Sequence, residues 1–251
     1  MVLGNRAPTG DRHPGAVGRV VVRAGVLLLA AAAAITGLMW LWGSLLVHGS
    51  TPAFLRHMDI QTTDWAVEHR TPTLDTMTHI GSMMADTIVA LVVTAVAVVV
   101  LRIYLGRWRE SIVIVVAILG ELLIFLAITA TVHRARPSVP QLDQAPPTSS
   151  FPSGHTGAAI ALYACLAVIC LRNLEPRWLA VSLAMLGFAT PVIVAASRVY
   201  RGMHYLTDVL AGMLAGGVWL AVVLLVLLRT RSTGEASSKE KERPPPGPSP
   251  I

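Results

Sequence analysis

Long apolar runs alternate with short polar segments along most of this chain. A membrane-spanning helix needs about 20 predominantly apolar residues, and the runs are of that order. The pattern therefore predicts an all-α integral membrane bundle of six transmembrane helices. The predicted spans cover residues 24–47, about 74 or 80 to 103, 111 to about 132, 153–171, 178–196 and 204–228.

The first apolar run has a second interpretation, a secretory signal peptide, because arginines precede it. The apolar region of a signal peptide is only about 7–15 residues long, and residues 24–47 exceed that length. We therefore expect a spanning helix here. Residues 59–67, between the first two spans, are predicted to form a short amphipathic helix at the membrane interface, with Trp65 as its anchor.

Polar segments flank the predicted membrane domain, which covers residues 24–228. Residues 1–23 carry four arginines and are expected to form a cytoplasmic N-terminal segment. Residues 229–251 are charged and then rich in proline, a composition typical of disordered chain. We expect them to form a cytoplasmic tail.

The composition agrees with a membrane protein. Hydrophobic residues make up 54% of the chain and charged residues 14%, whereas a soluble domain has about 25% charged residues. The formal net charge is +6, but the basic residues fall between apolar runs, and no basic stripe with stacking aromatic side chains accompanies them. The charge therefore indicates membrane topology, and no nucleic-acid partner is expected.

An even number of spans places both termini on one side of the membrane. The basic segments on that side are residues 1–23, 102–109, 172–177 and the tail. By the positive-inside rule this side is cytoplasmic. The segments that contain Arg136, His155 and residues 198–204 then open on the extracytoplasmic face. The composition, rich in arginine and alanine and poor in lysine, hints at a bacterial plasma membrane.

The two cysteines, Cys165 and Cys170, lie in one apolar run. Cysteines in such a run usually act as small packing residues. Their spacing is not typical of metal ligands. We expect neither a disulfide nor a metal site.

Residues 151–157 join a polar, proline-rich loop to a long apolar run. Pro152 is suited to open a helix because it has no N–H to leave unpaired, and Ser153 is a good N-cap residue. Gly154 allows a ligand to approach the backbone closely. The free N–H groups of the first helical turn predict a phosphate site. His155 would stand beside it as a proton donor to a leaving oxygen.

A second group of polar residues begins the last apolar run. His204 and Asp208 are four positions apart, so they share one face of a helix. A carboxylate beside an imidazole fixes the tautomer of the ring, which leaves His204 able to act as a nucleophile. Arg136 and Arg198 supply planar guanidinium groups that suit bidentate phosphate binding. Together these residues predict a phosphoryl-transfer site.

This set of residues resembles the type 2 phosphatidic acid phosphatase family, whose helical core is shared with vanadium haloperoxidases. The family pattern is Lys-x6-Arg-Pro, then Pro-Ser-Gly-His, then Ser-Arg-x5-His-x3-Asp. Residues 152–155 and 197–208 match the second and third motifs in full, and Arg136 with Pro137 matches the end of the first. The resemblance covers about residues 74–228 and implies a four-helix phosphatase/haloperoxidase-like core.

The resemblance also implies a role for each residue. His204 would attack phosphorus and form a phosphohistidine, with Asp208 orienting it. His155 would protonate the leaving group and then activate water. The phosphoryl oxygens would be held by Arg136, Arg198, Ser153 and the N–H of Gly154. The scheme uses no metal or other cofactor. The implied substrate is a lipid phosphate in the bilayer: phosphatidate, phosphatidylglycerol phosphate or a polyprenyl (di)phosphate.

The first motif departs from the family at one position. Thr129 stands where the family has its lysine, with six residues between it and Arg136. A lost cation weakens phosphate binding unless another cation replaces it. Our hypothesis is that Arg134 or Arg201 supplies that charge.

Two alternatives remain open at this point. The first is a phosphotransferase that forms the same phosphohistidine and passes the phosphate to another lipid or glycan. The second is a non-catalytic lipid-phosphate binder. Thr129 favours the binder, whereas His155, His204 and Asp208 argue against it, because binding alone needs no oriented nucleophile. The role of Glu121, a carboxylate inside an apolar run, is also open: such a group is either functional or neutral and hydrogen-bonded.

Overall fold

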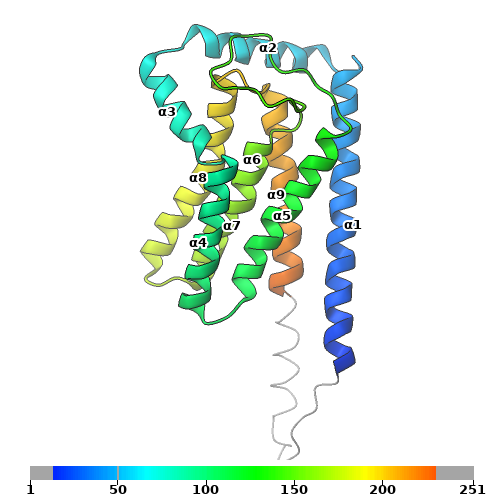
Figure 1. Ribbon diagram of the computed structural model, residues 1–251, viewed down its shortest axis with the longest axis vertical. Helices are drawn as coiled ribbons and strands as arrows, with labels where there is room; N and C mark the ends of the chain where they lie inside the picture. The colour runs from blue at the N-terminus through cyan, green and yellow to red at the C-terminus, as the bar shows by residue number, and fades with distance from the viewer. Residues whose placement is uncertain (1–13, 50, 230–251) are drawn as a thin grey trace, which may run out of the picture.

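The computed structural model describes residues 14–49 and 51–229, which form a bundle of long helices with shorter helices across one end (Figure 1). In this part of the chain six segments are long and apolar enough to cross a membrane. They are Gly18–Val47, Thr87–Leu105, Arg109–Thr129, Gly154–Asn173, Arg177–Tyr200 and Leu206–Leu228. The structure confirms the predicted fold class, an all-α membrane bundle with no strand among the described residues.

Each spanning segment corresponds to one helix or to a stack of helices. The single helices are α1 (Pro14–Val47), α4 (Thr87–Leu105), α5 (Arg109–Thr129), α8 (Arg177–Tyr200) and α9 (Leu206–Arg229). The remaining span is a continuous stack of α6 (Gly154–Ala159), the π-helical turn η1 (Ile160–Ala164) and α7 (Cys165–Asn173). Short π-helical insertions are rare and are frequent near functional sites. The apolar pattern did not predict this one.

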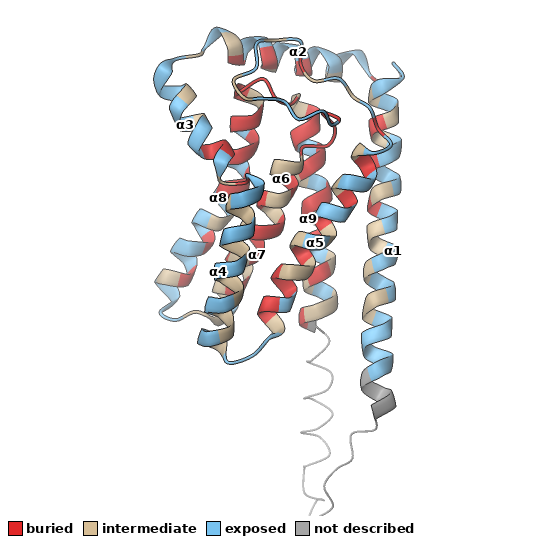
Figure 2. Cartoon of the chain, in the orientation of Figure 1, coloured by how far each residue is buried: buried red, intermediate tan, exposed pale blue. Residues whose placement is uncertain are grey.

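Buried side chains are concentrated in α5, α6–α7, α8 and α9, whereas α1 and α4 expose most of their surface (Figure 2). The main apolar cluster joins Ile114 and Ile128 of α5 to Leu162 of η1 and Trp219 of α9. The Trp219 indole N–H donates to the Ala117 carbonyl at 2.9 Å, so the large ring is buried without an unpaired donor. The exposed outer surface is apolar, as expected of helices that face acyl chains.

The two ends of the bundle differ. The described chain ends of α1 and α9 lie at one end, together with the short α4–α5 and α7–α8 connections (Figure 1). At the other end lie α2 (Ala53–Glu68), the long segment of residues 130–153 and the connection between α8 and α9. The structure thus confirms that all three motif segments meet at one end.

The interfacial helix is longer than predicted. Residues 59–67 were expected to be helical, and α2 extends from Ala53 to Glu68. It lies across the end of the bundle (Figure 1). It buries Asp59, Thr63 and Ala66 and exposes Phe54 and Trp65.

The predicted second span is wrong as a single helix. The structure divides it into α3 (Pro72–Met83) and α4, which begins at Thr87. Thr71 caps α3, accepting a hydrogen bond from Leu74 N at 3.2 Å, and Pro72 opens the helix. Asp86 caps α4, accepting from Ile88 N at 3.0 Å. A short carboxylate at this position binds the free N–H groups of a new helix and so favours the break.

The first span begins earlier than predicted. The helix starts at Pro14 rather than at residue 24, and its apolar spanning part starts at Gly18. Residues 14–23 of the expected N-terminal segment are therefore helical. The rest of that segment, residues 1–13, and the predicted disordered tail from residue 230 onward lie outside the described residues.

Candidate active site

The second-motif residues lie at the start of the α6–α7 stack. Ser153 occupies the N-cap position of α6, as predicted, but its hydroxyl accepts from Thr156 Oγ1 at 3.0 Å and makes no capping bond. The Ser153 N–H donates to the Asp208 carbonyl at 3.0 Å, which joins this turn to α9. The first-turn N–H groups, including those of Gly154 and His155, have no preceding helical carbonyl to bind.

The glycine of this motif has a packing role as well. A Cβ atom on Gly154 would lie 2.8 Å from the ring of Phe125 in α5. The space is tighter still at Gly157, one turn later, where a Cβ would clash with Oε1 of Glu121. The two glycines therefore let α6 approach α5, and the space we expected at Gly154 for a ligand is bounded by Phe125.

His204 is held in one tautomer by the backbone. Its ring is 3% exposed, and Nδ1 lies 2.7 Å from the carbonyl oxygen of Ser150. A carbonyl oxygen can only accept, so Nδ1 carries the hydrogen and Nε2 of the neutral ring is unprotonated. The arrangement leaves the lone pair of Nε2 free of a proton.

Asp208 acts on His204 through Ser150 rather than by a direct hydrogen bond. Its Oδ2 lies 3.8 Å from His204 Nδ1, accepts from the Ser150 hydroxyl at 2.5 Å and accepts from Tyr205 N at 2.9 Å. Its Oδ1 accepts from Arg134. The carboxylate is fully buried, so it fixes the residue whose carbonyl orients the histidine.

The protonation of His204 follows from its surroundings. Burial lowers the pKa of His204 below its ordinary value of 6.5, the negative charge of Asp208 offsets part of this, and Arg198 and Arg136 lower it further. The ring is therefore neutral at neutral pH. A neutral ring with a free Nε2 is the form that can attack phosphorus.

Arg136 and Arg198 each keep one buried donor free. Arg136 Nη1 donates to the Met203 carbonyl at 2.8 Å, and Arg198 Nη1 donates to Ser82 Oγ at 2.8 Å. The Nε groups of both are buried without a hydrogen-bond partner, as is that of Arg70 among the described residues. An unpaired buried donor costs about 1–3 kcal/mol. Each motif arginine thus keeps a buried Nε donor without a protein partner.

His155 completes the group from the first turn of α6. It is only partly buried. It lies near enough to Arg198 and His204 to interact with both electrostatically. The structure thus brings together the two histidines, the two arginines and the helix start that the sequence analysis proposed.

The residues proposed to replace the missing lysine have other partners. Arg134 binds Asp59 and Asp208. Arg201 binds both oxygens of Asp143, with its Nη2 2.6 Å from Oδ1 and its Nε 2.7 Å from Oδ2. Since both guanidinium groups are occupied by carboxylates of the protein, the structure argues against our hypothesis for either.

The Thr129 side chain makes its hydrogen bonds within its own helix, α5. Its hydroxyl donates to the Phe125 carbonyl of its own helix at 3.0 Å. It occupies the last position of α5. A neutral hydroxyl bonded in this way supplies no positive charge in place of the family's lysine.

The sequence analysis missed several residues of the site. Asp143 pairs with Arg198 at 3.3 Å and with Arg201, and His79 lies 3.9 Å from it. Ser82 binds Arg198 from α3, and Ser150 binds His204. These contacts join positions far apart in the chain, and no local pattern predicts them.

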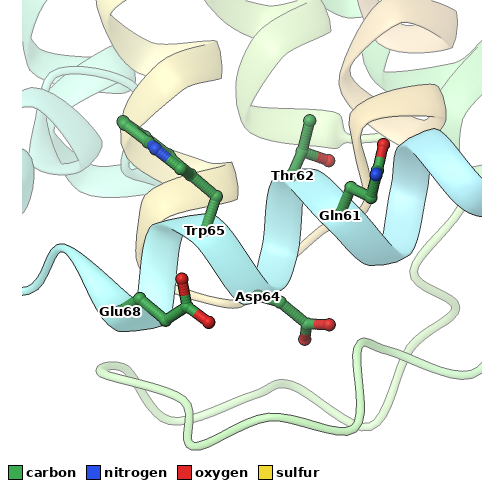
Figure 3. A pocket seen from close by; sticks show the side chains of 5 residues that line it. All are labelled: Gln61, Thr62, Asp64, Trp65 and Glu68. Atoms are coloured by element: carbon green, nitrogen blue, oxygen red, sulfur yellow. The ribbon is translucent and has the colours of Figure 1, made fainter.

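A separate hollow lies on α2 (Figure 3). It has a volume of about 510 Å³ and is lined by Gln61, Thr62, Asp64, Trp65 and Glu68. None of these residues belongs to the motifs. We assign this hollow no part in the chemistry.

Comparison with known families decides the identity of this site. The sequence matches the PAP2 superfamily over residues 84–232, more than half of the chain, and the match contains all three motif segments. The chain belongs to the PAP2 superfamily. With six helices long and apolar enough to cross a membrane among its described residues, it is an integral membrane member of that superfamily, as its motifs suggested.

Individual proteins that resemble this PAP2 protein share limited sequence identity with it. It is 36% identical over 80 residues to an undecaprenyl-diphosphatase of Sulfolobus acidocaldarius, an alignment that covers 32% of this chain and 34% of that protein. The chain thus matches only about a third of the length of that relative.

Two solved structures share the fold. The first is a transmembrane PAP2-type phosphatidylglycerolphosphate phosphatase from Bacillus subtilis, with a TM-score of 0.64 and 22% identity over 88% of this chain and 98% of the other. The second is LpxE of Aquifex aeolicus, with a TM-score of 0.53 and 18% identity over 66% and 94%. At these identities the likeness establishes the fold alone.

Proposed function

We propose that this PAP2 protein hydrolyses a phosphomonoester or diphosphate of a membrane lipid through a phosphohistidine formed on His204. The observation that carries the proposal is the 2.7 Å contact between His204 Nδ1 and the Ser150 carbonyl. With the hydrogen on Nδ1, Nε2 of the neutral ring is unprotonated. Burial lowers the pKa of the ring and so favours this neutral form. A histidine that served only to bind phosphate would need to be cationic instead.

The reaction has two balanced steps. In the first, Nε2 of His204 attacks phosphorus, the bond from phosphorus to the lipid oxygen breaks, and His155 gives a proton to that oxygen. In the second, His155 takes a proton from water, the water oxygen attacks phosphorus, and the P–N bond breaks. Inorganic phosphate leaves, and both histidines return to their starting states.

Positive charge for both steps comes from the protein. In this proposal the phosphoryl oxygens are held by Arg136 and Arg198, whose buried Nε groups have no protein partner, and by the first-turn N–H groups of Gly154 and His155, with Ser153 at the N-cap of that turn. Catalysis of phosphoryl transfer rests largely on such positioning and charge neutralisation. The scheme routes no step through a metal ion. Metal independence is accordingly part of this proposal.

The site faces the extracytoplasmic side in this proposal. The end of the bundle opposite the motifs carries Arg102, Arg107 and Arg109 near the α4–α5 connection and Arg172 and Arg177 near the α7–α8 connection. The positive-inside rule places such an end in the cytoplasm. A lipid could then keep its acyl or prenyl chains in the bilayer while its phosphate enters the site.

The substrate class is limited by the chemistry of the headgroup, a phosphate on a lipid alcohol or on another phosphate. The names of the relatives, an undecaprenyl-diphosphatase and a phosphatidylglycerolphosphate phosphatase, support including both classes. Phosphatidate belongs to the same panel. A monoester and a diphosphate present the same terminal phosphoryl group to His204.

The test is release of inorganic phosphate by the full-length protein in detergent. Phosphatidate, phosphatidylglycerol phosphate and farnesyl diphosphate would be supplied with and without EDTA, for the wild type, His204→Ala and the control His133→Ala at an exposed histidine. We expect release that survives EDTA, disappears in His204→Ala and persists in the control. Release that needs a metal, or that survives in His204→Ala, would refute the mechanism.

The same assay separates the two alternatives. Adding a lipid alcohol or a glycan as acceptor distinguishes a phosphotransferase, because labelled phosphate would then appear on the acceptor rather than in solution. Binding of labelled lipid without turnover would identify a non-catalytic binder. In that case Thr129→Lys would be the first variant to examine.

A further inference from the structure

Asp59 is a buried carboxylate outside every motif. It lies on α2, is 2% exposed and precedes the region that matches the PAP2 superfamily, which begins at residue 84. A carboxylate is rarely buried unless it is paired. Its partners therefore show what it does.

Two partners lie at the start of α9 and in the segment after α5. Asp59 Oδ1 accepts from Thr207 N at 2.9 Å, and Oδ2 accepts from Thr207 Oγ1 at 2.7 Å. Oδ2 also accepts from Arg134 Nη2 at 2.7 Å. Asp59 thus fixes the backbone of Thr207, one residue before Asp208.

Arg134 joins Asp59 to Asp208. One terminal nitrogen binds Asp59, while the other binds Asp208 and, at 2.7 Å, the Thr207 hydroxyl. The Tyr205 ring covers the guanidinium at 4.5 Å. Burial alone would lower the pKa of Arg134, but the two carboxylates outweigh it and raise the pKa above its ordinary value. One cation is therefore shared between two buried carboxylates.

The chain of contacts continues to the nucleophile. Asp208 accepts from the Ser150 hydroxyl at 2.5 Å, and the Ser150 carbonyl lies 2.7 Å from His204 Nδ1. We infer that Asp59 is a positioning residue for His204, acting through Arg134, Asp208 and Ser150. This inference rests on the proposed function, because it assigns Asp59 to the step in which His204 attacks.

The charges explain why two carboxylates are needed. When Nε2 bonds to phosphorus and Nδ1 keeps its hydrogen, the imidazole ring becomes positive, and Asp208 at 3.8 Å stabilises it. Arg134 alone would cancel the charge of Asp208. Asp59 takes one of the three hydrogen bonds of that guanidinium and restores a net negative charge beside the ring. Loss of Asp59 therefore acts on the transition state more than on substrate binding.

The variant that tests this is Asp59→Asn, with Asp64→Asn as its matched control. Asp64 is an exposed carboxylate on the same helix (Figure 3). With short-chain phosphatidate and farnesyl diphosphate as substrates, we expect Asp59→Asn to lower kcat by about 10- to 100-fold, the usual effect of removing a group that orients a reacting side chain. KM should stay within about twofold of the wild type because the phosphate-binding arginines are unchanged. Asp64→Asn should match the wild type in both constants.

A second variant guards against misfolding of the first. Thr207→Val keeps the side-chain volume but removes the hydroxyl that both Asp59 and Arg134 bind. We expect it to lower kcat by about 3- to 10-fold at constant KM. Only monodisperse protein from gel filtration would be assayed, and if Asp59→Asn does not yield it, Thr207→Val decides the question.

The outcomes are distinct. Wild-type kcat in the folded variants, or a raised KM at unchanged kcat, would overturn the role of Asp59. His204→Ala is measured in the same assay: if it keeps activity, the phosphohistidine proposal itself fails. If it is inactive while Asp59→Asn is normal, only the inference about Asp59 fails.

Discussion

Asp143 Oδ2 accepts a hydrogen bond from Arg198 Nη1 at 3.3 Å, and the same carboxylate binds Arg201 through both of its oxygens. Burial would raise the pKa of Asp143, but Arg201, Arg198 and His79 together hold it below the ordinary value. Asp143 is therefore ionised at neutral pH. An anion of the protein lies against an arginine that we assign to the substrate phosphate.

We predict that Asp143→Asn lowers KM for lipid phosphate. The substrate anion would no longer be repelled by the carboxylate beside Arg198. Because the pair is partly exposed, the expected change is about threefold, equivalent to ~0.7 kcal/mol. Steady-state kinetics on phosphatidate check this, with Asp64→Asn as the control. A KM that rises would show that Asp143 assists binding by holding Arg198 in place.

The acid limb of the pH–rate profile should reflect His204. The ring must be deprotonated to attack, and its pKa is lowered first by burial, with Arg198 and Arg136 adding to the effect and Asp208 opposing it. Activity lost through protonation of His204 should therefore appear below pH 6.5, the ordinary histidine value.

Asp208→Asn should move that limb to still lower pH. Removing a negative charge next to His204 lowers its pKa further, so the neutral ring persists into more acid solution, while kcat falls because the positive transition state loses support. The profile would be recorded as log kcat/KM for both proteins on one substrate. Titration of the substrate then contributes to both curves. A shift toward higher pH would contradict the assigned electrostatics.

Gly157→Ala should destabilise the fold. The added Cβ would clash with the carboxyl end of the Glu121 side chain, so that buried carboxyl would have to move within the packed interface of α5 and α6. Overpacking of this kind costs about 1–3 kcal/mol, or roughly 2–10 °C in the unfolding midpoint of a protein of this size. Thermal unfolding in detergent measures it.

The controls for this prediction change residues on α9 and α5. Gly217→Ala on α9 has nothing within 4 Å of the new Cβ and should leave the midpoint unchanged or slightly higher. Glu121→Ala combined with Gly157→Ala should recover part of the lost stability, because it removes the clashing carboxyl. If Gly157→Ala and Gly217→Ala behaved alike, close packing against Glu121 would not limit this position.

Arg134→Ala should affect stability as well as turnover. It leaves Asp59 and Asp208 buried without their shared cation, and breaking a buried pair in this way costs about 3–5 kcal/mol. A phosphate-binding arginine would instead raise KM with little effect on the unfolding midpoint. Measuring both quantities for Arg134→Ala and Arg136→Ala separates the two roles. A rise in KM alone for Arg134→Ala would restore the hypothesis that it replaces the missing lysine.

The sequence predicted the spans and the meeting of the motifs, because both depend on local signals. Apolar runs of about 20 residues specify membrane helices, and His204 and Asp208 are only four positions apart in sequence. The prediction that both share one helix face was wrong, because α9 begins at Leu206 and His204 lies two residues before it. The sequence did not predict the break between α3 and α4. From sequence alone, the capping carboxylate of Asp86 could not be told apart from an ordinary polar residue at the end of a span. Nor could the sequence pair Asp59 with Arg134 or Asp143 with Arg198. Those bonds join residues 75 and 55 positions apart and depend on how the helices pack.

The central claim is that phosphate is transferred to His204, and the labelled enzyme can be trapped. In His155→Ala the second step lacks its base, so p-nitrophenyl phosphate, whose leaving group needs no proton, should label the protein faster than water releases the label. After alkaline quenching, peptide mass spectrometry should find the phosphate on His204, and acid should remove it. His133→Ala combined with His155→Ala should label equally well, and His204→Ala combined with His155→Ala should not label. Label on another residue, or label that persists without His204, would contradict the account.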